Sequence, residues 1–93
     1  MQAGDIVIIT HNPHDTRAVD IIGVVRSIRR KAGTGGCDLA DVEFQDPLTS
    51  SRHILPFAGP SLLPATQQNV QALADALESR AAVLRRHLPI LRE

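Results

Sequence analysis

The apolar residues of this 93-residue chain follow two different periods, one in the first two-thirds and another in the last third. Up to about residue 64 they come in short β-branched runs separated by Gly, Pro and Asn, which is typical of short strands joined by turns. The expected strands are Asp5 to Thr10, Ile21 to Arg30, Leu39 to Gln45 and Arg52 to Leu55, with a short extended segment around Leu62. The third strand alternates most regularly, so it is predicted to bury one face only, made by Ala40, Val42 and Phe44.

Glycine and proline mark the expected connections. The segment Lys31 to Gly36 carries three glycines and predicts a hairpin loop between the second and third strands. The polar segment His11 to Asp20 predicts a long first loop. Gly23 lies inside the second strand and suggests a bulge or a sharp bend. Pro56 to Pro64 contains three prolines and is expected to join the two parts of the chain.

After Thr66 the apolar period becomes that of a helix. Val70, Leu77, Leu84 and Leu91 recur every seven residues, and the stripe is widened by Leu73, Ala74, Ala81 and Leu88. Thr66 is a suitable N-cap, and Pro89 lacks the amide that a helix interior needs. These signals predict a helix from Gln67 to His87.

The apolar stripe of this helix is expected to be buried against another apolar surface. The preferred interpretation is that it packs on the strands of its own chain, and the alternatives are a partner protein or a homodimer through the helix. Three heptads are short for an independent coiled coil. If the strands cover the stripe, Leu73 and Val83 at its flanks are the apolar residues left for a partner.

Five short strands in about 60 residues, with a long first loop, predict a mainly β chain. We expect an SH3-like five-stranded β-barrel over residues 1–64 and a C-terminal amphipathic α-helix over residues 65–93, packed on the barrel or on a partner. The single cysteine, Cys37, cannot form an internal disulfide, and no signal segment is evident, which favours the cytoplasm. The longest apolar run, Ile6 to Ile9, is far shorter than the ~20 residues of a membrane span.

Several segments of residues 1–64 resemble one group of SH3-like barrels. They are Gly4-Asp5-Ile6-Val7-Ile8, the loop with Asn12-Pro13-His14, Gly23-Val24-Val25-Arg26-Ser27-Ile28, Val42-Glu43-Phe44 and Arg52-His53-Ile54-Leu55. The group is the electron-transport accessory proteins, which include the variable chain of ferredoxin–thioredoxin reductase, the small barrel subunit of photosystem I and the barrel of the nitrile hydratase β subunit. The resemblance implies an accessory subunit beside a redox or metal enzyme. It transfers no catalytic residue and no cofactor to this chain.

The Gly-Asp-x-Val and Gly-x-Val segments also fit KOW-type barrels, so a nucleic-acid-binding module is the second hypothesis. It would use the only dense basic cluster, Arg26, Arg29, Arg30 and Lys31. Residues 1–64 nevertheless hold six basic and seven acidic residues. The preferred interpretation is that these charges are solvated or paired with Asp38, Asp41 and Glu43 on the adjacent strand, and a contact with a protein partner ranks next.

A third hypothesis is an endoribonuclease of the MazF type. Gly4-Asp5-Ile6-Val7 followed by Asn12-Pro13 resembles the start of those toxins, which share a related barrel and end in a helix. They continue with an Arg-Pro step into the second long strand, where this chain reads Val19-Asp20-Ile21-Ile22-Gly23. Thr16 and Arg17 are therefore not assigned as catalytic, and we expect the chain not to be an enzyme.

Candidate ligands for a metal ion are few. His11 and His14 lie near Asp15, and Cys37 or His53 could complete a tetrahedral site, but their spacing matches no known zinc pattern. A solvated polar turn is the preferred interpretation, so no metal or other cofactor is predicted. The run Gly33-Thr34-Gly35-Gly36 is followed by a strand, whereas a phosphate-binding loop opens a helix, and it is expected to be a hairpin tip.

Aromatic residues are scarce, and this excludes several kinds of binding site. The chain has no Trp or Tyr and only two Phe, Phe44 and Phe57. Aromatic grooves for polyproline and cages for methylated lysine therefore cannot be built, and platforms for stacking unpaired bases are poor.

Overall fold

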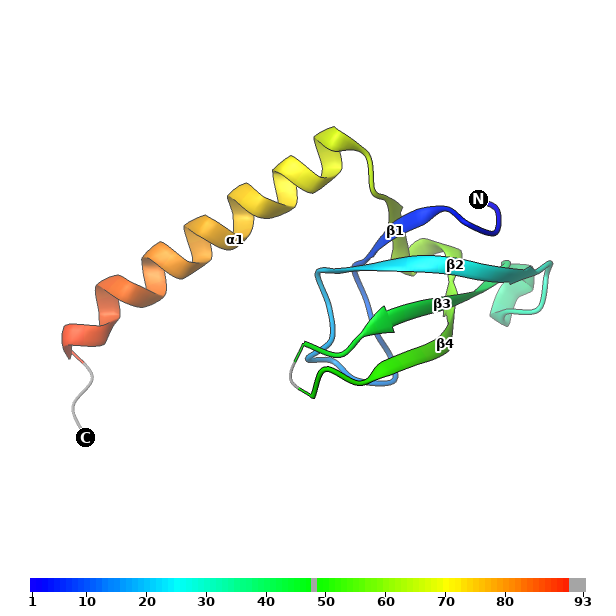
Figure 1. Cartoon of the computed structure of the whole chain (residues 1–93), viewed down its shortest axis with the longest axis horizontal. Helices are drawn as coiled ribbons and strands as arrows, with labels where there is room; N and C mark the ends of the chain where they lie inside the picture. Colours follow the sequence, from blue (N-terminus) through cyan, green and yellow to red (C-terminus); the bar gives the residue numbers. More distant parts are fainter. Residues whose placement is uncertain (48, 91–93) are drawn as a thin grey trace.

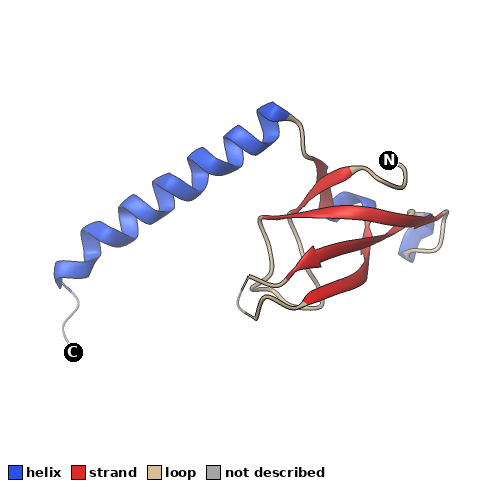
Figure 2. Ribbon diagram, in the orientation of Figure 1, coloured by secondary structure: helices blue, strands red, loops and turns tan. Residues whose placement is uncertain are grey.

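The computed structural model of the chain describes residues 1–47 and 49–90. It contains five strands, three short 3-10 turns and one long helix (Figures 1 and 2). The strands are β1 (Ile6–Ile9), β2 (Ile21–Arg29), β3 (Leu39–Gln45), β4 (Arg52–Ala58) and β5 (Leu62–Pro64). The helix is α1 (Gln67–His87), and the turns are η1 (Thr34–Gly36), η2 (Gly59–Ser61) and η3 (Leu88–Ile90). The predicted bounds of the third strand and of the helix are confirmed; Leu91 lies outside the described residues.

The strands form one antiparallel sheet in the order β4-β3-β2-β1-β5. The central pair β2 and β3 carries the longest ladder, and the short β5 pairs with β1 through Leu62 and Pro64. Among the described residues no ladder joins β4 to β5, so the sheet has two edges. The mainly β fold with a C-terminal helix is thus confirmed, whereas closure into a barrel stays a prediction.

One face of the sheet carries the hydrophobic core. The buried cluster draws on every strand and on the first loop: Val7, Ile9, Ala18, Val25, Ala40, Val42, Phe44, Phe57 and Leu62. Ala40, Val42 and Phe44 are buried while Asp41 and Glu43 lie on the other face, as the alternation predicted. The core is therefore built by the period-two pattern of the strands.

Gly23 and the bulge of β2 are separate features. The register of β2 against β3 shifts between Val25 and Ser27, so the bulge lies at Arg26 and the prediction of a bulge at Gly23 is wrong. At Gly23 a Cβ would collide with Val42 Cγ1 and lie 3.1 Å from the carbonyl oxygen of Glu43. Glycine is required there because the two strands approach closely.

The segment Pro56 to Pro64 is not a connection between two parts of the chain, which corrects the prediction. It contains the end of β4, the η2 turn and all of β5. Pro56 lies in β4 opposite Asp41. Proline is tolerated there because β4 is an edge strand, with a neighbouring strand on one side only. The connection from β5 to α1 is only Ala65 and Thr66.

The helix α1 does not pack on the sheet of its own chain, contrary to the preferred interpretation. It leaves the end of β5 and points away from the strands (Figure 1), and none of its described residues is buried. Two hydrogen bonds hold this direction: the Asn69 backbone N–H donates to Thr66 Oγ1 (3.1 Å), and Asn69 Nδ2 donates to the Pro64 carbonyl (2.9 Å). Thr66 is thus the predicted N-cap. The molecule measures 50 × 29 × 26 Å.

Candidate functional site

The basic cluster runs along the end of β2, and each of its arginines has an acidic neighbour on or near β3. Arg26 Nη2 donates to Glu43 Oε2 at 2.6 Å and Arg29 Nη2 donates to Asp41 Oδ1 at 2.9 Å. Arg30 Nη1 donates to Asp38 Oδ2 at 2.9 Å, and the backbone N–H of Lys31 donates to Asp38 Oδ1. The predicted cross-strand pairing is therefore confirmed for the three arginines.

These contacts hold the carboxyl groups in their charged form. The backbone N–H of Lys31 and then the guanidinium of Arg30 lower the pKa of Asp38 below its ordinary value of 3.8. The Arg26 guanidinium lowers the pKa of Glu43 below 4.5. In the first loop, the backbone N–H of Arg17 and then its side chain lower the pKa of Asp15. The arginines are half or more exposed, so each ion pair is screened by solvent.

The lowered pKa values predict an acid-sensitive fold. A carboxyl whose pKa is lower in the folded state binds fewer protons there than in the unfolded chain, so its contribution to stability is complete above the unfolded pKa and is lost as pH falls through the folded pKa. We expect the free energy of unfolding, measured by urea titration, to be steady from pH 7 to 5.5 and to fall below about pH 4.5. The substitution Glu43→Gln should make this fall in stability less steep. If the triple variant Glu43→Gln, Asp38→Asn, Asp15→Asn kept the pH profile of the parent chain, the prediction that these carboxyl groups cause the fall would be wrong.

The candidate metal ligands are not brought together. His14 Nε2 lies 2.9 Å from the Pro56 carbonyl oxygen and its ring meets Phe57 edge-on at 5.7 Å between centroids. The His53 ring lies 5.7 Å from that of Phe44, and Cys37 Sγ contacts the Thr34 carbonyl in the hairpin loop. No group of three or more His, Cys, Asp or Glu residues that could hold a metal ion occurs in the described part of the chain.

The glycine-rich run is the tip of the β2–β3 hairpin, as predicted. It holds the η1 turn and is closed by a hydrogen bond from the Gly33 N–H to the Cys37 carbonyl (2.8 Å). Gly35 and Gly36 have φ values of 74° and 79°, which favour glycine. The run therefore serves the turn, and a strand follows it.

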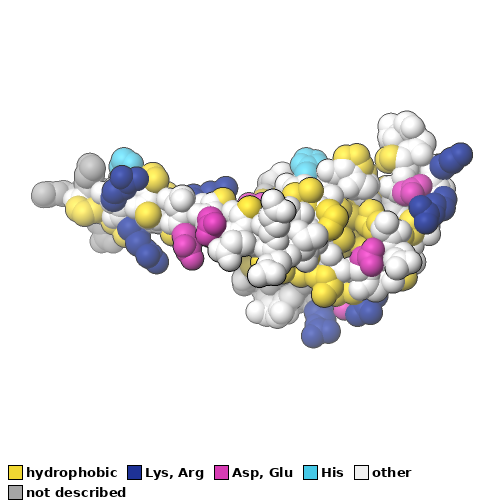
Figure 3. All heavy atoms as spheres, turned by 90° about the horizontal axis from the view of Figure 1, so that it is seen from above, with side chains coloured by type: hydrophobic (Ala, Val, Ile, Leu, Met, Phe, Trp, Pro, Cys, Tyr) yellow, Lys and Arg dark blue, Asp and Glu magenta, His cyan; other side chains and the backbone are white. Residues whose placement is uncertain are grey.

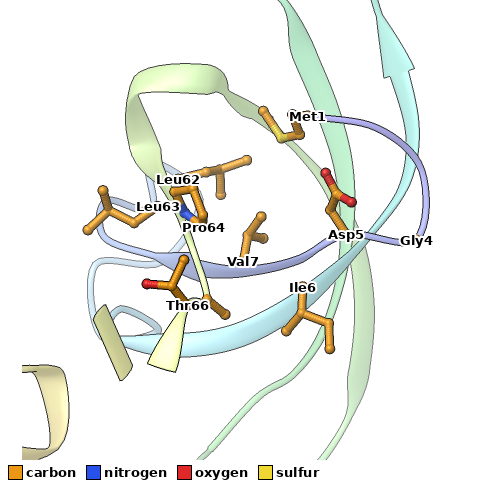
Figure 4. Close-up of a pocket in the computed structure, with 10 residues that line it drawn as sticks. Met1, Gly4, Asp5, Ile6, Val7, Leu62, Leu63, Pro64 and Thr66 are labelled. Atoms are coloured by element: carbon orange, nitrogen blue, oxygen red, sulfur yellow. The ribbon is translucent and has the colours of Figure 1, made fainter. Parts of the chain in front are cut away.

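An open groove of about 540 Å³ lies between the start of β1 and β5 (Figure 4). Met1, Val7 and Leu62 point into a shared space, and Ile6 points to the opposite side of the strand from Val7 (Figure 4). Asp5 carries the only ionisable side chain of the lining, and its Oδ2 accepts a hydrogen bond from the Gln2 N–H. The groove is thus suited to an apolar group.

The outer face of the sheet, opposite the core, is also apolar. Ile6 is paired with Val24, and Ile8 is paired with both Ile22 and Leu63, so these five side chains form one surface across β5, β1 and β2. Ile8 at its centre is 2% exposed although it lies outside the core cluster. Ile54 on β4 extends the face beyond Glu43. We call Ile6, Ile8, Ile22, Val24, Ile54 and Leu63 the outer face.

The outer face is the functional candidate that the sequence patterns missed. Exposed fractions are 55% for Ile6, 49% for Ile22, 56% for Ile54 and 46% for Leu63. Viewed from above, hydrophobic side chains are visible on the sheet body and along the helix, while basic side chains lie along the helix and at the edges of the sheet body (Figure 3). The signal in the sequence is the unbroken run Ile6–Ile9, which supplies apolar side chains to both faces of β1.

The two helix residues predicted to meet a partner differ in exposure. Leu73 is half-buried, and Val83 is 42% exposed. Three leucines of the stripe itself are also exposed, Leu84 and Leu88 at 62% each and Leu77 at 40%. These three leucines are thus open to a partner, whereas Val70, Ala74 and Ala81 of the stripe are half-buried.

No family model, curated protein or solved structure matches this chain. None of the helices in residues 1–47 and 49–90 is long and apolar enough to cross a membrane.

Proposed function

We propose that this chain is a non-catalytic protein-interaction module, an SH3-like sheet that docks on a larger protein through its outer face. The observation that carries the proposal is the exposure of Ile6, Ile22, Ile54 and Leu63, each close to half, on one surface of the sheet. Ile6, Ile22 and Leu63 adjoin Ile8 and form a contiguous apolar surface, with Ile54 beyond Glu43. Surface of this kind marks an interaction site, because its burial against a partner removes it from water. The groove beside β1 shares Ile6 and Leu63 with the outer face and extends it.

The charge arrangement favours a protein over a nucleic acid as the partner. Nucleic-acid affinity depends on cations that are free to neutralise phosphates. Arg26, Arg29 and Arg30 instead donate to carboxylates at 2.6 to 2.9 Å. A phosphate would have to compete with these carboxylates for the arginines. An apolar protein surface can bury the outer face and leave the ion pairs in place.

The resemblance of residues 1–64 to electron-transport accessory barrels supports the same proposal. In that group the barrel packs beside a catalytic subunit, which would be a redox or metal enzyme. Under this proposal the chemistry belongs to the partner, and this chain contributes a surface. The KOW-type and MazF-type hypotheses then make opposite predictions, namely nucleic-acid binding and RNA cleavage.

The test is affinity purification of the tagged chain from its own host, before and after nuclease treatment. We expect one stoichiometric protein to survive nuclease, to be retained by Val83→Lys and to be lost by Ile22→Lys. The two variants are matched, because Ile22 is 49% exposed and Val83 is 42% exposed and each exchanges an apolar side chain for lysine. Circular dichroism of both variants checks that the fold is kept.

Three outcomes would overturn this proposal. The first is that all bound protein leaves with nuclease and nucleic acid is found in the untreated sample. The second is cleavage of a mixed RNA substrate by the purified chain. The third is that Ile22→Lys and Val83→Lys retain the partner equally, which would exclude the outer face as the docking surface.

A further inference from the structure

We propose that α1 pairs with α1 of a second copy of this chain in an antiparallel, two-helix contact. This inference goes beyond the proposed function, because it uses the helix and not the outer face. The helix points away from its own sheet, and none of its described residues is buried. The leucines Leu77, Leu84 and Leu88 are 40%, 62% and 62% exposed. The apolar seam of α1, the charges along the helix and the position of the sheet all favour a second copy as the partner.

The seam follows the spacing of a helix pair. Apolar residues recur at alternating intervals of four and three: Val70, Ala74, Leu77, Ala81, Leu84 and Leu88. That is the 3.5-residue period of two helices that wrap around each other. From Val70 to Leu84 the seam alternates large and small side chains, so Leu84 of one helix can fit against Ala81 of the other.

The charges of α1 choose the antiparallel direction. Residues 67–78 hold Asp75 and Glu78 and no Lys or Arg, whereas residues 79–87 hold Arg80, Arg85 and Arg86 and no acidic residue. An antiparallel pair puts the acidic half of one helix beside the basic half of the other, and it opposes the two helix dipoles. A parallel pair would put like charges side by side.

The same charges select one register. Glu78 and Arg85 each follow a seam leucine, so they lie on the same flank, and equal flanks face each other in an antiparallel pair. With Ala81 opposite Leu84 and Leu77 opposite Leu88 of the second copy, Glu78 of each helix faces Arg85 of the other. A shift by one heptad would instead set Glu78 against Glu78 and Arg80 against Arg80.

The sheet prepares the helix for pairing. A seam of this length is marginal when the helix must also be nucleated. Here the first turn is held by the Thr66 cap and by Asn69, and Arg80 Nη1 lies 3.9 Å from Oδ2 of Asp20, the residue before β2. The connection to the sheet is two residues long, so an antiparallel pair sets the two sheets at opposite ends of the paired helices.

The first test is the mass of the full chain in solution, by sedimentation equilibrium from about 1 µM to 1 mM. We expect a reversible dimer of twice the 10.1 kDa chain mass. Arg85→Glu should weaken the dimer about tenfold, Glu78→Arg should do the same, and the double variant should restore it. Arg86→Glu is the matched control, because Arg86 lies roughly 160° around the helix from the centre of the seam.

The second test is disulfide cross-linking in a Cys37→Ser background. Leu77→Cys and Leu88→Cys chains should form covalent dimers when mixed and oxidised, because a disulfide needs Cα atoms roughly 4.4–6.8 Å apart. Leu77→Cys alone should not, because its own copy would be 11 residues away, about 16 Å along the helix. Cross-linking of each variant alone would show a parallel pair and overturn the proposal. A monomer at every concentration, or equal effects of Arg85→Glu and Arg86→Glu on the dimer, would overturn it as well.

Discussion

Replacing Phe57 by alanine is expected to lower the free energy of unfolding by about 3 to 5 kcal/mol. Phe57 is 1% exposed and belongs to the core cluster. Its ring meets those of Phe44 and His14 edge-on, at centroid distances of 5.9 and 5.7 Å. The substitution removes these contacts and leaves a cavity between the edge strand β4 and the first loop.

This loss is large for a chain of this size. A 93-residue domain has a total stability of roughly 5 to 14 kcal/mol, so Phe57→Ala is expected to shift the urea midpoint strongly. Ile54→Ala is the matched control on the same strand, since Ile54 is 56% exposed and its truncation should change stability by about 0.5 kcal/mol or less. Equal losses in the two variants would contradict the assignment of the core to the face that holds Phe57.

Replacing Asn12 by alanine is expected to lower the free energy of unfolding by about 2 to 3 kcal/mol. Asn12 is the only buried polar residue among the described residues, at 0% exposure. Its Nδ2 donates to the Ala18 carbonyl at 3.1 Å, and its Oδ1 accepts from the backbone N–H groups of His14 and Asp15 at 2.9 and 3.1 Å. Alanine would leave these three backbone groups without their partner.

The measurement is urea unfolding together with hydrogen exchange of the first loop. The amides of His14 and Asp15 should exchange faster in Asn12→Ala, since they lose the Oδ1 acceptor. His11→Ala is the control, because His11 is exposed and adjacent, and its stability should stay within about 0.5 kcal/mol of the parent chain. Unchanged amide exchange in Asn12→Ala would show that Asn12 does not hold this loop.

Some features of the candidate site depend on residues close together in the sequence, and others depend on contacts between distant segments. The pairing of Arg26, Arg29 and Arg30 with carboxylates was predictable, because the strands either side of a short hairpin lie next to each other. The choice of partners was not, because the bulge at Arg26 shifts the register of β2 against β3. The outer face was not predicted either, since the strands that carry its residues are brought together from distant parts of the chain.

The sequence by itself determined the features that a few neighbouring residues control. It determined the one-sided alternation of β3, the hairpin tip with its glycines and the helix from its Thr66 cap to the residues before Pro89. Only the tertiary structure decided which side of the run Ile6–Ile9 faces the core, because an unbroken apolar run has no polar side to mark the solvent. It also placed Pro56 in an edge strand and directed α1 away from the sheet. Both depend on contacts between segments far apart in the chain, which periodicity does not record.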